Sequence, residues 1–598
     1  MKKILLSITF ALMGIVSGFA AKAYSGIVTV TQSDGTELNV RIYGDEHFNW
    51  LTTEDGVLLV QEGNNYYIAE TTSYGTLKAT NYIAHNANKR LPAEIKAIKK
   101  QDLSRFRSYA IKKTSPAKAM GTGNSGVKYF PHSGSPKALV ILVEFSDTPF
   151  QSGEKAKNVF EHFLKGKAED NLPDGYEAYT GSYKNKNNLR NKGSVTDYFY
   201  DMSKGTYTPQ FDVVGPYKLN QPSLYYGKGE NDNTYALVSD ACKAADKDVD
   251  FSRYDADGDG MVDLVYIIYA GYPASMSGNP NDIWPKSGPG NGSFGTYDGK
   301  KVCRYGVHAE LNFGRELNQK NGFLLSGIGL FCHEFSHTLG LPDLYPTVDA
   351  SKVDNQNPEM WDLMDGGEYT YNGGYCPTPY SPWEMDAMGW ATPIELSDEK
   401  QTVTLKSYGK ERIAYKIKGE NNEYLLLQNI QIGGWWTGVA YVYKTGMLVW
   451  RIDYNNEDVN LFDNPNNTLG KPKVMIVPAD GYVISDYNHG DGKQWTDDEY
   501  KSSLQGDPFP GKGNITQLLS VTLNNSTLEK PIYNIKEENG VITFDYLDNI
   551  SAIQLPSVDE TDMTTKQIFS LDGRYLGNDA SKLTKGIYII GKKKVMIK

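Results

Sequence analysis

Metal-binding and proton-transferring residue types meet in one stretch of the chain, "CHEFSHTLGLPDLY". His333 and His337 are four residues apart, so on a helix they share one face and both imidazoles can reach one zinc ion. Glu334 lies beside them and can take a proton from a zinc-bound water as a general base. Gly340 can end the helix in the left-handed conformation and turn the chain, which would return Asp343 as a third, oxygen ligand. The spacing predicts a zinc-dependent hydrolase centre.

A second set of metal-type ligands lies in "DADGDGMVD", where carboxylates alternate along a loop that contains glycines. Calcium prefers such oxygen ligands. The expected ligands are the Met261 carbonyl and the side chains of Asp255, Asp257, Asp259 and Asp263. The loop is not a full EF-hand, because its twelfth position is a tyrosine, and a solvated acidic turn is the alternative interpretation.

Strands and helices that could position the zinc site alternate across residues 137–395, the predicted catalytic domain. "KALVILVEFSD", from Lys137, and "GMVDLVYIIYAG", from Gly260, are continuous apolar runs typical of buried strands. "SVTDYFYDMS" begins with a capping serine and has the apolar spacing of a helix. "FLLSGIGLF" precedes the two histidines and would bury their helix.

The N-terminal part of the chain predicts export and a propeptide. Residues 1–23 have a basic start, a short apolar run and an Ala21-Lys22-Ala23 cleavage motif, which indicates a signal peptide. Residues 24–113 alternate apolar and polar positions as in a small antiparallel β unit with a helical stretch after it, and residues 114–136 read as a linker. An ordinary β domain is the alternative to a propeptide. This unit has no cysteine to cap a zinc ion, so the candidate blocking groups are Asp34, Asp45, His47 and Asp55.

The remaining regions and the bulk composition narrow the class of protein. Residues 396–547 show short strands and turns typical of a β-sandwich-like domain, and residues 548–598 form a last β module. The net charge of −11 argues against a nucleic-acid partner, and no segment after the signal peptide is apolar enough to cross a membrane. Export permits disulfides among the four cysteines, and we expect Cys303 to pair with Cys332.

Several motifs together resemble one family of enzymes. "IGLFCHEFSHTLGLPDLY", "WDLMDGG", "YSPWEMDAMGW" and "SVTDYFYDMSKGTYTPQFDVVGP" look like the immune inhibitor A-type family of secreted metallopeptidases, over about residues 137–546. The resemblance implies a multidomain α+β protein, in which a metzincin-like α/β zinc peptidase domain follows a small β propeptide and precedes β-sandwich-like domains. It also implies His333, His337 and Asp343 as zinc ligands and Glu334 as the base.

The resemblance suggests roles for residues that follow the predicted helix with His333 and His337. In metzincin-type peptidases a methionine in a tight turn forms a hydrophobic floor below the metal, and Met364 matches that methionine, although a plain core methionine is the alternative. The third-ligand assignment has three competitors, Glu359, Glu368 and Glu384. Related enzymes place an oxyanion-stabilising tyrosine here, and the candidates are Tyr369, Tyr371 and Tyr375.

The chain end "QIFSLDGRYLGNDASKLTKGIYIIGKKKVMIK" resembles the C-terminal sorting modules of the type IX secretion route, which implies a contact with outer-membrane secretion machinery. A plain accessory β domain is the alternative. The sequence therefore predicts a secreted or cell-surface zinc endopeptidase that is made as a zymogen, acts on proteins or peptides, and uses Zn²⁺ and Ca²⁺. The rival hypothesis is a surface adhesion protein with a vestigial zinc site, but such a protein would usually have lost the base, and Glu334 is present.

Overall fold

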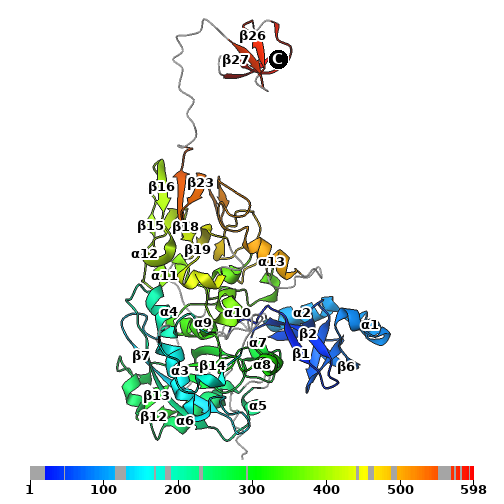
Figure 1. Cartoon of the computed structure of the whole chain (residues 1–598), viewed down its shortest axis with the longest axis vertical. Helices are drawn as coiled ribbons and strands as arrows, with labels where there is room; N and C mark the ends of the chain where they lie inside the picture. The colour runs from blue at the N-terminus through cyan, green and yellow to red at the C-terminus, as the bar shows by residue number, and fades with distance from the viewer. Residues whose placement is uncertain are drawn as a thin grey trace, which may run out of the picture. The chain divides into compact units, whose positions relative to one another are not determined.

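A computed structural model shows two compact units, residues 1–548 and 549–598 (Figure 1). The structure describes residues 21–45, 48–114, 129–167, 170–181, 190–227, 233–290, 294–439, 444–454, 463–485, 495–549, 567–571, 574–579, 582–590 and 593–597. The predicted signal peptide therefore lies outside the described residues, except for its last three positions.

The first region of unit 1 is a six-stranded antiparallel sheet in which neighbouring strands are consecutive along the chain. Its strands are β1 (Val28–Thr31), β2 (Glu37–Gly44), β3 (Asn49–Thr53), β4 (Leu58–Glu62), β5 (Asn65–Thr71) and β6 (Leu77–Ile83). The helical stretch expected after the sheet forms two helices, α1 (Pro92–Ile98) and α2 (Leu103–Thr114). The sheet has the antiparallel strands that the alternating sequence pattern predicts.

A five-stranded mixed sheet forms the centre of the region between residues 137 and 390. The strand order is β11 (Lys286–Pro289), β14 (Arg304–Ala309), β10 (Val265–Tyr269), β7 (Lys137–Glu144) and β8 (Gln210–Lys218), and only β11 runs antiparallel to its neighbour. The apolar run from Gly260 to Gly271, predicted as one strand, contains two. Its first part, β9 (Met261–Val262), pairs instead with β13 (Lys300–Val302) of a small sheet completed by β12 (Thr296–Tyr297).

Helices cover both faces of the central sheet, and alternation along the strands explains why. In β7, Val140 and Leu142 join one apolar cluster, whereas Leu139 and Ile141 join another on the opposite face. Helices α3 (Ala156–Lys165), α4 (Val195–Met202) and α9 (Ile328–Leu339) contribute to the first cluster, and α6 (Thr234–Ala245) contributes to the second. Both faces of the sheet are therefore buried, as the continuous apolar sequence of β7 predicts.

The serine predicted to cap α4 does so, because the Ser194 hydroxyl accepts a hydrogen bond from the Asp197 backbone N–H. The other α-helices in the described part of unit 1 have eight residues or fewer: α5 (Ser223–Tyr226), α7 (Ala274–Ser277), α8 (Arg315–Asn321), α10 (Thr370–Gly374), α11 (Pro382–Ala387), α12 (Tyr408–Glu411) and α13 (Asp497–Leu504).

A second β region follows residue 390. It packs against the region of the central sheet, and the two regions share one apolar cluster. One sheet has the order β15 (Ile394–Glu395), β17 (Tyr415–Lys418), β18 (Glu423–Ile430), β19 (Gly446–Asp453) and β20 (Val474–Ile476). A smaller sheet orders β16 (Gln401–Leu405), β24 (Val541–Tyr546) and β23 (Ile532–Glu538), and β21 (Val521–Thr522) pairs with β22 (Thr527–Leu528). Leu425 and Leu427 pack between the two sheets, whereas Leu426 joins the apolar cluster that contains α9. Because β18 is buried on both faces, this region and the central sheet form one compact unit.

Unit 2 is a four-stranded antiparallel sheet with the order β26 (Tyr575–Gly577), β25 (Ile568–Ser570), β27 (Gly586–Ile590) and β28 (Lys593–Ile597). Among the described residues of the whole chain, no helix is long and apolar enough to span a membrane.

The expected disulfide between Cys303 and Cys332 is not formed. All four thiols are free and buried. Cys332 lies in α9 and packs into the apolar cluster of its sheet face, whereas Cys303 lines a hollow beside the acidic loop around Asp257. The two cysteines thus face different surroundings.

Candidate metal centre

Helix α9 presents the metal-binding residue types and ends where the sequence predicts. All twelve of its residues are buried. Gly340 ends the helix with a φ of 109°, a left-handed conformation that glycine adopts at little cost. A Cβ atom at Gly340 would also lie 3.1 Å from the Tyr129 ring. The turn reverses the chain and brings Asp343 back to the histidines.

The two imidazoles are oriented by backbone carbonyls. His333 Nδ1 lies 3.0 Å from the Leu363 carbonyl oxygen, and His337 Nδ1 lies 2.8 Å from that of Leu341. A carbonyl oxygen only accepts hydrogen bonds, so each Nδ1 must carry the proton. In the neutral rings the Nε2 lone pairs then face each other, with 3.2 Å between the two nitrogens. Such an arrangement suits a cation between them.

Asp343 completes a three-atom cluster. Its Oδ1 lies 3.3 Å from His333 Nε2 and 3.2 Å from His337 Nε2. Ligands about 2.0 Å from a tetrahedral zinc ion are about 3.3 Å from one another, so this spacing fits zinc. Burial alone would raise the pKa of Asp343, but the imidazoles of His337 and His333 lower it to about 2. Asp343 thus offers the carboxylate oxygen that a third ligand requires.

Glu334 is buried beside this cluster, and burial raises its pKa to about 8. Its Oε1 accepts a hydrogen bond of 2.7 Å from the backbone N–H of Ala21, a residue 313 positions earlier in the chain. The glutamate that the sequence identifies as a base therefore already contacts a peptide nitrogen.

The chain around Ala21 lies in the site in the manner of a bound peptide. The Ala21 carbonyl accepts a hydrogen bond of 2.9 Å from Trp284 Nε1, and the Lys22 carbonyl accepts one of 2.6 Å from the Tyr369 hydroxyl. The Tyr24 backbone N–H donates to the Ser275 carbonyl at 2.8 Å. We call residues 21–24 the cleft segment. The sequence did not predict this contact, because Ala21-Lys22-Ala23 has the pattern of a signal-peptide cleavage site.

The groups expected to block the site lie elsewhere. Asp34 accepts a hydrogen bond from the Thr36 backbone, Asp55 binds the Arg90 guanidinium, and Asp45 lies 3.7 Å from the Lys352 ammonium. His47 lies outside the described residues. The expectation that Asp34, Asp45 or Asp55 occupies the centre is therefore wrong, and the cleft segment is there instead.

The three rival carboxylates have other neighbours. Glu368 Oε2 lies 3.6 Å from His333 Nδ1, the nitrogen that already faces the Leu363 carbonyl. Glu384 caps α11 by accepting a hydrogen bond from the Ser381 backbone N–H, and Glu359 lies 3.7 Å from the Lys22 ammonium. Among the four candidates, Asp343 is the one that the structure groups with both histidines.

Met364 and the tyrosines after it are also placed. Met364 is fully buried, and its carbonyl accepts a hydrogen bond from the Leu344 N–H, next to the Asp343 turn. Tyr369 is the tyrosine that contacts the cleft segment. Tyr375 donates instead to the Leu325 carbonyl, and Tyr371 is 40% exposed. Of the three tyrosines, only Tyr369 thus binds a peptide carbonyl of this segment.

The acidic loop forms the other group of potential metal ligands. Oxygens of Asp255, Asp257 and Asp263 lie within 4.8 Å of one another. Asp259 is not in this group, and its Oδ1 accepts a hydrogen bond from the Met261 backbone N–H. The Lys300 ammonium lies 2.6 Å from Asp255 Oδ2, and a further bond to that oxygen comes from the Gly260 N–H. The loop therefore brings three of the five expected ligands together.

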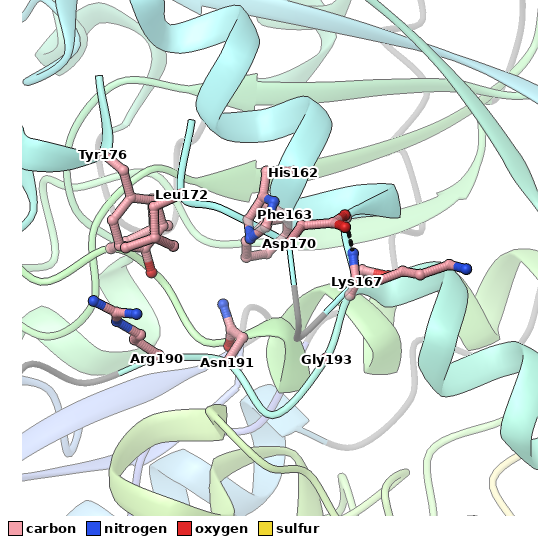
Figure 2. Close-up of a pocket in the computed structure, with 12 residues that line it drawn as sticks. His162, Phe163, Lys167, Asp170, Leu172, Tyr176, Arg190, Asn191 and Gly193 are labelled. Atoms are coloured by element: carbon pink, nitrogen blue, oxygen red, sulfur yellow. Dashed lines mark hydrogen bonds between the residues drawn. The ribbon is translucent and has the colours of Figure 1, made fainter. Parts of the chain in front are cut away.

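A hollow beside α3 lies near the first residue of α9 (Figure 2). His162 and Asp170 line it, and Asp170 accepts a hydrogen bond of 2.8 Å from the Lys167 backbone N–H. Asn191, in the wall of the hollow, accepts a hydrogen bond from the Ile328 N–H at the first residue of α9. Asn191 thus holds the first residue of α9 in place. The residues that line the hollow do not include His333, His337 or Asp343.

Comparison with known proteins finds a family of peptidases that is similar to the region around this site. Residues 128–390 match the family model described as "Immune inhibitor A peptidase M6, catalytic domain". The matched range contains the metal cluster, Glu334 and the acidic loop.

Individual curated proteins are similar to part of this chain. "Immune inhibitor A" of Bacillus thuringiensis subsp. alesti is 26% identical over 320 residues, 44% of this chain and 42% of the relative. "Pre-pro-metalloprotease PrtV" of Vibrio cholerae is 25% identical over 41% of this chain and 29% of the relative. A "Putative secreted metallopeptidase" of Arthroderma benhamiae is 23% identical over 41% of this chain and 39% of the relative. The chain thus matches less than half of the length of these curated relatives.

Proposed function

We propose that this chain is a secreted zinc-dependent endopeptidase that is made as a zymogen and hydrolyses peptide bonds of extracellular proteins. The observation that carries the proposal is the cluster of His333 Nε2, His337 Nε2 and Asp343 Oδ1 beside a glutamate that contacts a peptide nitrogen. The match to a peptidase M6 catalytic domain and the metallopeptidase names of the relatives support it.

In this proposal His333, His337 and Asp343 hold the zinc ion, which would supply a polarising charge and an activated water. Glu334 takes the proton of the attacking water and passes it to the leaving nitrogen. Its carboxylate can reach such a nitrogen, because it lies 2.7 Å from the amide nitrogen of Ala21.

Two further groups position the substrate backbone. The Trp284 indole N–H and the Tyr369 hydroxyl bind the carbonyls of the first two residues of the cleft segment. We propose that they bind substrate carbonyls in the same way. In this proposal the Tyr369 hydroxyl orients the substrate peptide beside the metal centre.

We also propose that the cleft segment keeps the zymogen latent. It contacts the proposed base and occupies two backbone-binding groups, so a substrate cannot use them at the same time. The sheet β1–β6 continues from this segment, and the Tyr66 hydroxyl donates to the Gly278 carbonyl of the peptidase region. The whole N-terminal region, rather than a single blocking side chain, then maintains latency.

The proposal is tested by incubating the full chain, activated by limited proteolysis in residues 103–128, with a denatured protein and a peptide library. We expect cleavage that a zinc chelator abolishes and stoichiometric zinc restores. Cleavage that persists in excess chelator would contradict a metal-dependent mechanism, and the absence of cleavage under all conditions would contradict a peptidase.

We further propose that the acidic loop binds one structural calcium ion. Three carboxylates in close approach repel one another, and the single charge of the Lys300 ammonium, which contacts Asp255, offsets only one of them. Oxygen ligands of this kind suit calcium. Excess calcium should raise the melting temperature of the full chain and a calcium chelator should lower it. A melting temperature that is the same in both solutions would contradict this site.

Unit 2 is proposed to be a sorting module for the outer-membrane secretion machinery. It forms its own sheet and is a separate compact unit. Deletion of residues 549–598 should leave the peptidase activity of the activated chain intact but stop its export to the cell surface. Normal export of the shortened chain would contradict the sorting role.

A further inference from the structure

We infer that Glu359 and Asp365 form a buried subsite that selects a lysine or arginine side chain of the substrate, and that Lys22 fills this subsite in the present chain. The inference deepens the proposed peptidase function and rests on it.

The contact is an ion pair inside the protein. The Lys22 ammonium lies 2.5 Å from Asp365 Oδ1 and 3.7 Å from Glu359 Oε2. The lysine side chain is 2% exposed, and both carboxylates are fully buried. A buried charge in such a setting needs an oppositely charged or hydrogen-bonding partner, because removal from water is costly for each charge.

The two carboxylates are held in place by other groups, so the subsite does not depend on Lys22 for its shape. Asp365 Oδ2 accepts hydrogen bonds from the Glu359 backbone N–H at 2.6 Å and from the Asn357 amide at 2.7 Å. Glu359 accepts one bond from the same amide and one of 2.9 Å from the Tyr500 hydroxyl. These bonds orient Asp365 Oδ1 toward the ammonium. A single bound cation offsets one of the two carboxylate charges, and the Asn357 amide and the Tyr500 hydroxyl stabilise Glu359 by donating hydrogen bonds.

The subsite also has room for a long cationic side chain. Gly366 follows Asp365, and a Cβ atom there would lie 3.4 Å from the Lys22 ammonium. That distance is an ordinary van der Waals contact, so the lysine ammonium packs directly beside this glycine. A neutral side chain of similar length could fill the space but would offer the carboxylates no positive charge, which is the basis of discrimination.

The position of Lys22 relative to the proposed base tells which substrate residue enters the subsite. The backbone nitrogen of Ala21 lies at Glu334, where the leaving nitrogen of a cleaved bond must lie to receive its proton. Ala21 therefore stands for the first residue after the cleaved bond, and Lys22 stands for the second. Tyr369 fixes this register by binding the Lys22 carbonyl.

The test uses the full chain after proteolytic activation and two peptides that differ only at the second residue after the cleaved bond, lysine in one and norleucine in the other. We expect kcat/KM at least tenfold higher for the lysine peptide. Asp365→Asn and Glu359→Gln should each reduce this ratio toward one. Asp248→Asn, which changes a carboxylate that is 52% exposed on the surface, is the matched control and should keep the full ratio.

A binding measurement separates failure of this inference from failure of the peptidase proposal. The peptide Ala-Lys-Ala-Tyr, labelled at its C-terminus, should bind the activated chain at least tenfold more tightly than Ala-norleucine-Ala-Tyr in fluorescence anisotropy, even if no substrate is cleaved. Equal affinities, or a library profile with apolar or acidic residues preferred at this position, would overturn the subsite. Absence of cleavage together with tight lysine-selective binding would instead count against the peptidase proposal alone.

Discussion

At the residue scale, the proposed roles of metal ligand and general base follow from the hydrogen bonds that each side chain already makes. The Nδ1 atoms of His333 and His337 face backbone carbonyls, so their Nε2 atoms are available to a metal. Glu334 contacts a peptide nitrogen and is not part of the three-atom cluster. Metal binding and proton transfer should therefore be separable by mutation.

The Glu334→Gln variant should keep its zinc, because the glutamate is not a ligand in this account. Its peptidase activity after activation should fall by at least ~10²-fold, the usual scale for loss of a positioned general base. His333→Ala should lose zinc as well as activity, since two ligands hold the ion poorly. Metal analysis by mass spectrometry and hydrolysis rates check both variants. A Glu334→Gln variant without zinc would contradict the division of roles.

At the element scale, the position of Asp343 depends on how α9 ends. Gly340 has a left-handed backbone and lies against the Tyr129 ring. The local sequence was sufficient to predict this turn, the capped helix α4 and the buried strand β7, because each depends on neighbouring residues. It could not predict that the run from Gly260 splits into two strands, because that depends on pairing with β13.

Gly340→Ala should destabilise the protein and weaken zinc binding. The left-handed conformation costs an alanine about 1–2 kcal/mol relative to glycine, and the new Cβ would press on Tyr129 at 3.1 Å. Gly389→Ala is the matched control, because Gly389 has a φ of 68° and no atom within 4 Å of its added Cβ. It should lower the melting temperature without changing zinc affinity. Equal zinc affinity in both variants would show that the turn does not position Asp343.

At the scale of the whole molecule, the principal finding is that residues 21–24 lie at the site. Ala21 and Glu334 are 313 residues apart, and no local pattern connects them. The sequence also could not predict that Glu359 and Asp365 form an acidic pair, because both contact Lys22, which is more than 300 positions earlier in the chain. The motif Ala21-Lys22-Ala23 was interpreted as a cleavage site, yet these residues are buried and hydrogen-bonded. We propose that the exported chain retains them, and N-terminal sequencing should then find a first residue at or before Ala21 rather than Tyr24.

The full-length chain should be much less active than the chain cut between residues 103 and 128. The sequence also predicts activating cleavage after one of three basic residues, Arg107, Lys112 and Lys113. All three lie within α2, so cleavage there requires the helix to open locally. Lys22→Met should raise the activity of the uncut chain, because it removes the ammonium that pairs with Asp365 and so loosens the cleft segment. Lys96→Met, on the exposed face of α1, is the control and should change nothing. Uncut protein as active as cut protein would contradict latency.

The central claim, that His333, His337 and Asp343 hold one zinc ion, is tested most directly by zinc X-ray absorption spectroscopy of the purified full chain. We predict one zinc per chain, with two imidazole nitrogens and light oxygen donors at about 2.0–2.2 Å, and loss of this zinc in Asp343→Ala. Sulfur scattering at about 2.3 Å, or an unchanged zinc signal in Asp343→Ala, would contradict it.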